Sequence, residues 1–450
     1  MKKKFLYPAI VSVFAVLLCI IIYSYTNKKN AAAAMIFELL PRKSALAQDA
    51  AWPGIQAEAE KYQDALKVND IDSKAMLQLS NIFISEARVT GNYTYYDKAA
   101  LHYVNKALTL DSANFEALVL KSLLYLSQHH FTDGLNIAIK AKNINPYNSF
   151  VYGLLTDAYV ETGMYDSAVA SAQKMVDTRP DIRSYSRVSY IREIYGDYPG
   201  AIEAMKDAVN AGLPGDESTE WARIHLGQLY ENTGDLKNAE MQYNIALKQR
   251  PGYAYAKAGL GRVALAGKKY DDAVQYLSEA VDAVADDGLK EQLATAYRMQ
   301  GNTSKANALM KEVIDDMNAS SNDAQKDENV GHYVDRELAY AYIITKDYDK
   351  ALEHALLEYN RRPDNIDVNE CVAWAYYNKS DYSKASSYIN RAMQTGCKNP
   401  VLLCRAGLIY TKSGDTGKAK IILQEALQNK PNIDAVLMND AIHILQSIQQ

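Results

Sequence analysis

The chain has 450 residues, of which 48% are hydrophobic and 23% are charged, and its formal net charge is −5 at pH 7. These proportions are ordinary for a folded protein and argue against wholesale disorder. The chain is slightly acidic and has no run of five or more basic residues, so we do not expect a nucleic-acid partner.

The N-terminus combines a short basic tail, residues 1–4, with a long apolar segment, residues 5–25. The 21 residues of this segment carry no charge and, as a helix, would span about 31 Å, close to the hydrocarbon thickness of a bilayer. A cleavable signal usually has a shorter apolar stretch, so the sequence favours a retained signal-anchor over cleavage near residues 31–33. We therefore predict a single-pass membrane protein whose C-terminal bulk is periplasmic or extracytoplasmic.

The residues that follow predict a linker over 26–53 and a capping helix over 54–72. At the other end of the chain, residues 432–450 carry apolar residues at helical spacing and polar residues between them. This half-polar pattern predicts a second capping helix that shields the end of the intervening fold.

Between the caps, over residues 73–431, one pattern recurs ten times around a small residue, which we call the anchor. Successive anchors lie 33 to 45 residues apart, most often 34. The anchors are Ala100, Gly134, Ala168, Ala201, Ala239, Ala273, Ala306, Ala351, Ala385 and Ala419. From the second copy on, another small residue stands twelve positions before the anchor, and a tyrosine usually follows three positions after it. Two recurring small positions on successive helices indicate that the two helix backbones approach closely.

Glycines and prolines mark the helix ends. Five copies have a glycine five residues before the anchor, where it can take the left-handed conformation of a turn. These glycines are Gly163, Gly196, Gly234, Gly301 and Gly414. Five copies have a proline twelve residues after the anchor, where one helix should end and the next begin. Extra residues occur at 91–95, 212–216 and 318–331, and we expect all three insertions to be polar loops.

The spacing, the small residues and the turn signals together resemble the tetratricopeptide repeat family. This resemblance implies an all-α fold: an α-solenoid, wound as a right-handed superhelix, of about ten helix–turn–helix repeats. With the N-terminal segment, the prediction is this solenoid plus one transmembrane helix. A unit of this size buries its apolar face only by stacking on its neighbours.

No motif for catalysis, metal binding or cofactor binding occurs. The seven histidines are scattered, and neither a Walker loop nor a GxSxG elbow is present. Cys371, Cys397 and Cys404 are expected to be buried, unpaired thiols. We therefore expect a protein that is not an enzyme and needs no metal or small-molecule cofactor.

In this family the first helix of each repeat lines the concave groove, and positions counted back from the anchors project onto that face. Aromatic residues and arginines usually carry the binding energy at interfaces, which selects a set of candidates. They are Phe150, Arg183, Tyr190, Trp221, Tyr255, Arg262, Arg298, Tyr333, Arg336, Tyr340 and Trp374. The same positions can also pack between neighbouring first helices, so the sequence leaves a structural role and a binding role open.

The function indicated by this architecture is a membrane-tethered scaffold that binds protein or peptide partners in its groove. Resemblance to bacterial envelope proteins suggests assembly or export of envelope polymers as the setting. The alternative is a protein that binds glycan or peptidoglycan, with Trp221, Tyr255, Tyr340 and Trp374 stacking on sugar rings.

Overall fold

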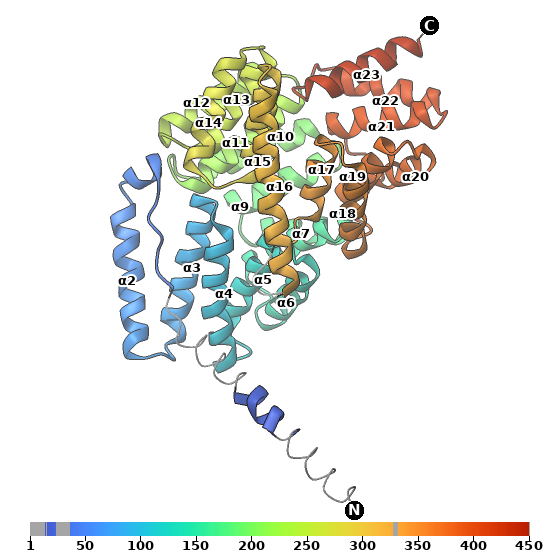
Figure 1. The fold of residues 1–450 in the computed structure, drawn as a ribbon. Coiled ribbons are helices and arrows are strands. Elements are labelled where there is room, and N and C mark those ends of the chain that lie inside the picture. Colours follow the sequence, from blue (N-terminus) through green and yellow to red (C-terminus); the bar gives the residue numbers. More distant parts are fainter. Residues whose placement is uncertain (1–13, 15, 24–36, 327–331, 450) are drawn as a thin grey trace, which may run out of the picture.

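The structure, a computed structural model, describes residues 14, 16–23, 37–326 and 332–449. Across these residues every regular element is a helix and no strand occurs, which confirms the all-α prediction. Helices α3 to α22 form ten successive pairs, one for each predicted repeat (Figure 1).

The pairs, in chain order, are α3 (Ser73–Thr90) with α4 (Tyr93–Leu110), α5 (Phe115–Ser127) with α6 (Phe131–Ile144), α7 (Ser149–Glu161) with α8 (Tyr165–Thr178), α9 (Ile182–Ile194) with α10 (Tyr198–Ala211), and α11 (Glu217–Asn232) with α12 (Leu236–Gln249). They continue with α13 (Ala254–Ala266) and α14 (Tyr270–Ala283), α15 (Asp287–Met299) and α16 (Thr303–Lys326), α17 (Asp335–Ile344) and α18 (Tyr348–Arg361), α19 (Ile366–Asn378) and α20 (Tyr382–Ala392), and α21 (Pro400–Lys412) and α22 (Thr416–Leu427).

The anchors explain why the two helices of a repeat pack closely. All ten are buried, and a small residue of the first helix lies against the second helix. In two repeats this residue is a serine that bonds directly to the anchor: Ser189 Oγ donates to the carbonyl oxygen of Ala201 over 2.7 Å. In others it is a glycine whose missing side chain leaves space: a Cβ on Gly261 would lie 2.7 Å from Leu277 Cγ. The recurring small residues therefore set the distance between the helices.

Both ends of the array are covered by further helices. Helix α2 (Trp52–Val68) packs on α3, and α23 (Ala435–Ser447) packs on α21 and α22. The 3₁₀ helix η2 (Ser44–Gln48) precedes α2. Residues 37–43, inside the segment predicted as a linker, belong to the folded core: Phe37 is buried, and Arg42 makes a bidentate ion pair with Glu86 at 2.6 and 2.9 Å.

Two of the three expected loop insertions are helical. The insertion around residues 91–95 lengthens α3 and α4 to 18 residues each, and the added turns contact residues 37–43. Residues 318–326 continue α16, because no glycine or proline stops the helix there. Residues 327–331 lie outside the described residues, and 212–216 are a loop as expected.

The predicted single-pass membrane localisation is wrong. No helix in the described part of the chain is both long enough and apolar enough to cross a bilayer. Of the predicted segment 5–25, the structure describes only residues 14 and 16–23, and the rest lies outside the described residues.

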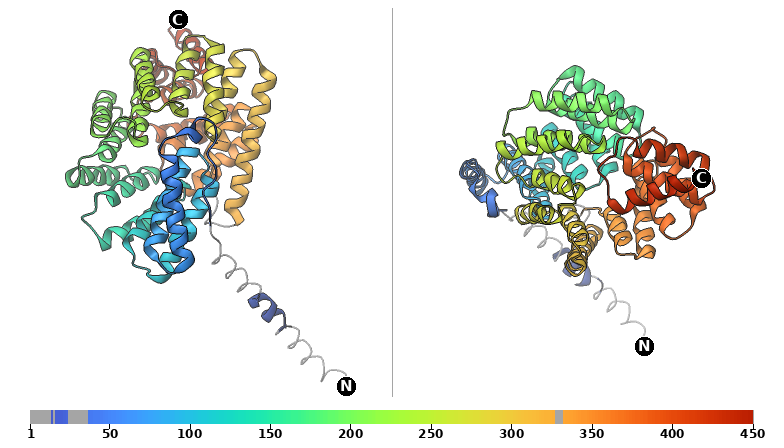
Figure 2. Two further views of the ribbon diagram at one scale, coloured as in Figure 1. Left: turned by 90° about the vertical axis from the view of Figure 1, so that its left-hand side faces the viewer. Right: turned by 90° about the horizontal axis from the view of Figure 1, so that it is seen from above.

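The array coils so far that its second turn rests on its first (Figure 2). The inner turn of a repeat, between its two helices, contacts the chain that leads into the first helix six repeats later. Asn365 donates to the carbonyl oxygens of Val160 and Glu161, 205 and 204 residues away, at 3.4 and 3.2 Å. Asn432 donates in the same way to Glu231, 201 residues away, at 2.7 Å from its side chain and 3.0 Å from its backbone. One turn of the coil therefore takes six repeats.

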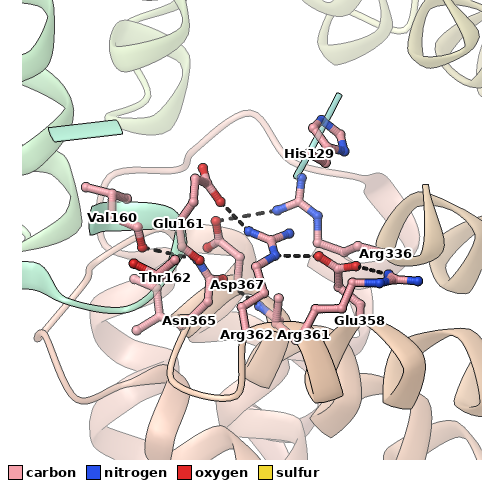
Figure 3. Close-up of polar contacts among 12 residues, drawn as sticks. His129, Val160, Glu161, Thr162, Arg336, Glu358, Arg361, Arg362, Asn365 and Asp367 are labelled. Atoms are coloured by element: carbon pink, nitrogen blue, oxygen red, sulfur yellow. Dashed lines mark hydrogen bonds and ion pairs between the residues drawn. The ribbon is translucent and has the colours of Figure 1, made fainter. Parts of the chain in front are cut away.

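A buried ionic network reinforces the middle of this contact (Figure 3). Arg362, which follows α18, pairs with Glu161 of α7 in the turn below and with Glu358 of its own helix. Only 4% of the Arg362 side chain is exposed. Beside it, the backbone N–H of Ile366 donates to the hydroxyl of Tyr165 over 2.8 Å.

The inner-turn glycines of the first coil turn also lie against the second. The predicted left-handed conformation is confirmed at Gly163, with φ of 80°, and at Gly414, with φ of 93°. A Cβ on Gly163 would lie 2.5 Å from the backbone of Asp364, whereas one on Gly414 would meet nothing within 4 Å. Gly91, Gly196 and Gly234 are confined in the same way as Gly163. Gly163 is therefore needed both for its conformation and for the contact between turns.

We expect Gly163→Ala to destabilise the protein more than Gly414→Ala. Both changes place a side chain in the left-handed region, at about 1–2 kcal/mol each. Only Gly163→Ala also forces apart the two coil turns, so its denaturation midpoint should fall further and its radius of gyration in X-ray scattering should rise. Equal losses in the two variants would contradict a close contact between the turns.

We expect Arg362→Met to cost about 3–5 kcal/mol, because it leaves Glu161 buried without its cation. Arg179→Met is the matched control: Arg179 also stands one residue before a proline at the end of a second helix, but its side chain is 71% exposed. Its ion pair with Asp181 should contribute less than about 1 kcal/mol. Chemical denaturation followed by circular dichroism measures both; a similar small loss in each would show that Arg362 does not hold the turns together.

Candidate partner-binding site on the first helices

A cavity of about 430 Å³ lies where first helices from the two coil turns face each other. Helix α9 of the first turn forms one side, and α17, α19 and α21 of the second turn form the other. We call this space the inner cavity. It exists only because the coil brings repeat 4 next to repeats 8 to 10.

Three of the eleven predicted groove residues line the inner cavity: Tyr190 of α9, and Arg336 and Tyr340 of α17. Tyr190 is 38% exposed, yet burial among surrounding protein atoms raises its pKa well above the usual value, as expected for a ring that faces an enclosed space. The sequence therefore located part of this site, and the binding role of these residues stays a prediction.

Other predicted residues are engaged in contacts within the chain. The Arg183 guanidinium lies 5.1 Å from the centre of the Phe150 ring. Trp374 stacks on Tyr377 with 4.7 Å between ring centres, and Tyr255 hydrogen-bonds to Asp286 over 3.3 Å. These contacts favour a packing role.

Two predicted residues take part in the contact between coil turns. Arg262 makes an ion pair with Glu231 at 2.9 Å, and Glu231 accepts the bond from Asn432. The backbone N–H of Tyr333 donates to Gln128 over 3.2 Å, and its ring stacks on His130 at 4.1 Å. Both residues therefore stabilise the coil.

The last two lie apart from the inner cavity. Trp221 is 38% exposed and packs against His225, with 3.9 Å between ring centres. Arg298 is exposed near the end of α15.

The sequence analysis missed four charged residues of the inner cavity: Glu193, Asp367, Glu370 and Arg405. Asp367 and Glu370 stand eighteen and fifteen residues before Ala385, the same positions that gave Phe150 and Arg336 in other repeats. They were passed over because only aromatic residues and arginines were selected. Including acidic residues at those positions would have found them.

The charged side chains of the inner cavity are held in fixed positions. Arg405 pairs with Glu370 at 2.8 Å and donates to the Tyr340 hydroxyl at 3.1 Å. Its guanidinium also lies over the Tyr340 ring, 4.8 Å from the centre. Arg336 pairs with Glu337 at 3.0 Å and lies 3.5 Å from Asp367. These contacts preorganise the wall of the cavity.

The cysteines near this site are inert. Cys371, Cys397 and Cys404 are buried and unpaired, as expected, and Cys397 lines the inner cavity. Burial raises the pKa of each thiol to about 12. Because the thiolate is the reactive form of cysteine, none of them is a nucleophile at neutral pH.

A strained carboxyl group lies on α15, fifteen residues before Ala306. Oε1 of Glu291 is buried and has no hydrogen-bond partner among the described residues. Burial, together with the negative charge of Glu337, raises the pKa of Glu291 to about 8. The folded state therefore holds a proton here that the unfolded chain, with an ordinary glutamate, releases at lower pH.

We expect Glu291→Gln to remove part of the loss of stability on alkalinisation. Since the pKa of Glu291 is raised on folding, the wild-type protein loses stability as the pH rises from the unfolded pKa toward about 8. The variant should match the wild type near about pH 5 and exceed it by on the order of 3 kcal/mol near about pH 8.5. Thermal melting across this range tests the effect, with exposed Glu240→Gln as control; a pH-independent difference would contradict it.

Comparisons with known proteins agree with the helix pairs. Family models described as tetratricopeptide repeat match residues 224–288 and 401–433, which hold the anchors Ala239, Ala273 and Ala419. A search of curated proteins finds no match.

Three similar solved structures are all helical-repeat proteins or contain them by fold. A thermophilic TPR protein of Thermus thermophilus is 21% identical and covers 46% of this chain and 99% of its own, with a TM-score of 0.36. A tetratricopeptide repeat protein of Parabacteroides merdae is 14% identical and covers 66% and 98%, with a TM-score of 0.36. The human IFIT1 dimer is 12% identical and covers 78% and 81%, with a TM-score of 0.46. With two family models matching repeats whose helices and anchors the structure displays, the chain belongs to the tetratricopeptide repeat family.

Proposed function

We propose that the protein is a non-enzymatic scaffold that binds segments of partner proteins in the inner cavity. Tetratricopeptide repeats generally mediate binding between proteins. The observation that carries the proposal is the convergence of Tyr190, Arg336 and Tyr340 on one cavity of about 430 Å³. This volume falls within the range of ligand-binding clefts and suits a few side chains of a bound segment.

The composition of the wall supports a peptide as the ligand. Ile194, Ile366, Val401 and Leu402 supply apolar surface, and the fixed charges of Arg336 and Arg405 lie beside them. A partner segment can bury apolar side chains here while polar groups set its direction, as in other concave sites. The sequence-based setting in envelope assembly depended on the membrane segment and is not part of this proposal.

The alternative of glycan binding has less support. Sugar rings stack on open aromatic faces, but Arg405 lies over both Tyr340 and Trp374, at 4.8 and 5.3 Å from the ring centres. Tyr255 is partly buried and hydrogen-bonded. Of the four aromatic residues considered for this role, Trp221 is the most exposed and lies outside the inner cavity.

We expect Val401→Trp to weaken peptide binding by at least ~10-fold, because the indole fills the inner cavity. Peptides are first selected from a random display library against the wild-type protein, and their affinities are measured by fluorescence polarisation. The control is Val169→Trp on α8, where the valine is 41% exposed and away from the cavity. The proposal fails if no peptide is selected, or if selected peptides bind Val401→Trp as tightly as the control.

A further inference from the structure

The inner cavity carries more negative than positive charge. Its lining contains three carboxylates, Glu193, Asp367 and Glu370, and two guanidinium groups, Arg336 and Arg405. Arg405 is neutralised by Glu370 at 2.8 Å. Arg336 is neutralised mainly by Glu337, which lies outside the lining, and its distance to Asp367 is longer, 3.5 Å. The excess charge therefore belongs to Glu193 and Asp367.

Glu193 has only neutral partners. Its carboxylate accepts from the Tyr198 hydroxyl at 3.4 Å and from the side-chain amide of Asn232 at 3.2 Å. Within the part of the chain that the structure describes, no lysine, arginine or histidine forms an ion pair with it. Burial raises the pKa of Glu193 to about 6, so the group is charged at neutral pH and would gain from a nearby cation.

Tyr190 lies three residues before Glu193 on α9, so both side chains share one face of the helix. The Tyr190 ring is 38% exposed, and no other ring or cation stacks on it among the described residues. This differs from Tyr340, whose face is taken by Arg405. Ile194 and Ile366, which pack in one cluster, supply an apolar wall next to this face.

We propose that Tyr190, Glu193 and this apolar wall form a subsite for a cationic side chain, lysine or arginine, of the bound partner segment. The inference rests on the proposed function. The aliphatic stem of such a side chain packs on Ile194 and Ile366, while its charged end reaches both the carboxylate and the ring face. A charge-assisted contact of this kind is about twice as strong as a neutral hydrogen bond. The subsite selects among partners by charge.

The experiment uses the peptides selected from the random library, restricted to those whose binding is blocked by Val401→Trp. We expect these peptides to be enriched in lysine or arginine, and replacement of that residue by norleucine to lower affinity for the wild type by about 10-fold. Glu193→Gln should lower affinity for the parent peptide by a similar factor but leave affinity for the norleucine peptide unchanged. Glu240→Gln, an exposed site on α12, should have no effect.

The outcomes separate the two proposals. If no peptide is selected, or if Val401→Trp blocks none, the proposed function fails and the subsite fails with it. If blocked peptides lack a cation, or if Glu193→Gln binds the parent peptide unchanged, the cavity binds peptides but the cationic subsite is refuted. Tyr190→Leu provides a second variant that keeps the carboxylate and removes the ring, and it should also weaken the parent peptide more than the norleucine peptide. Equal losses for the two peptides would refute the role of the ring.

Discussion

The contact between successive turns of the coil, six repeats apart, determines most of what is distinctive here. A repeat array is normally held together by neighbours alone, and its stability is a sum over adjacent units. In this chain, backbone and side-chain bonds from Asn365 and Asn432, together with the buried Arg362–Glu161 pair, join residues more than 200 positions apart. These bonds couple repeats that nearest-neighbour stacking would leave independent, and they form only after both turns have wound.

The same contact creates the candidate site. Without it, α9 would face open solvent, and α17, α19 and α21 would lie on a separate turn. With it, their side chains enclose one space whose charges are fixed by Arg405–Glu370 and Arg336–Glu337 pairs. The cost of burying those charges is offset within the wall itself, which leaves Glu193 as the carboxylate with no cation of its own.

Local features of the fold could be predicted because the repeat writes them into the sequence: the anchors Ala201 and Ala273 are buried, and Gly163 takes the left-handed turn. The contact between turns could not, because it depends on the coil's pitch, which small rotations accumulated over six repeats decide. Arg179 and Arg362 occupy the same repeat position, yet one is exposed and the other buried. For the same reason Tyr333 and Arg262, predicted to bind a partner, instead stabilise the coil, and the acidic half of the cavity was missed. The membrane prediction relied on residues 5–25 alone, and no helix in the described part of the chain has the required length and apolarity.

The glycines of the first coil turn have a consequence for how such a chain can evolve. Tandem arrays commonly lengthen or shorten by whole units, since each unit meets only its neighbours. Here Gly91, Gly163, Gly196 and Gly234 each meet a backbone six units further on. Deleting one internal unit would shift every later loop by a full step, so that bulky turns such as the one at Lys268 would face the loops that glycine now admits. Unit number in this array is therefore constrained by geometry in a way that open, uncoiled arrays escape.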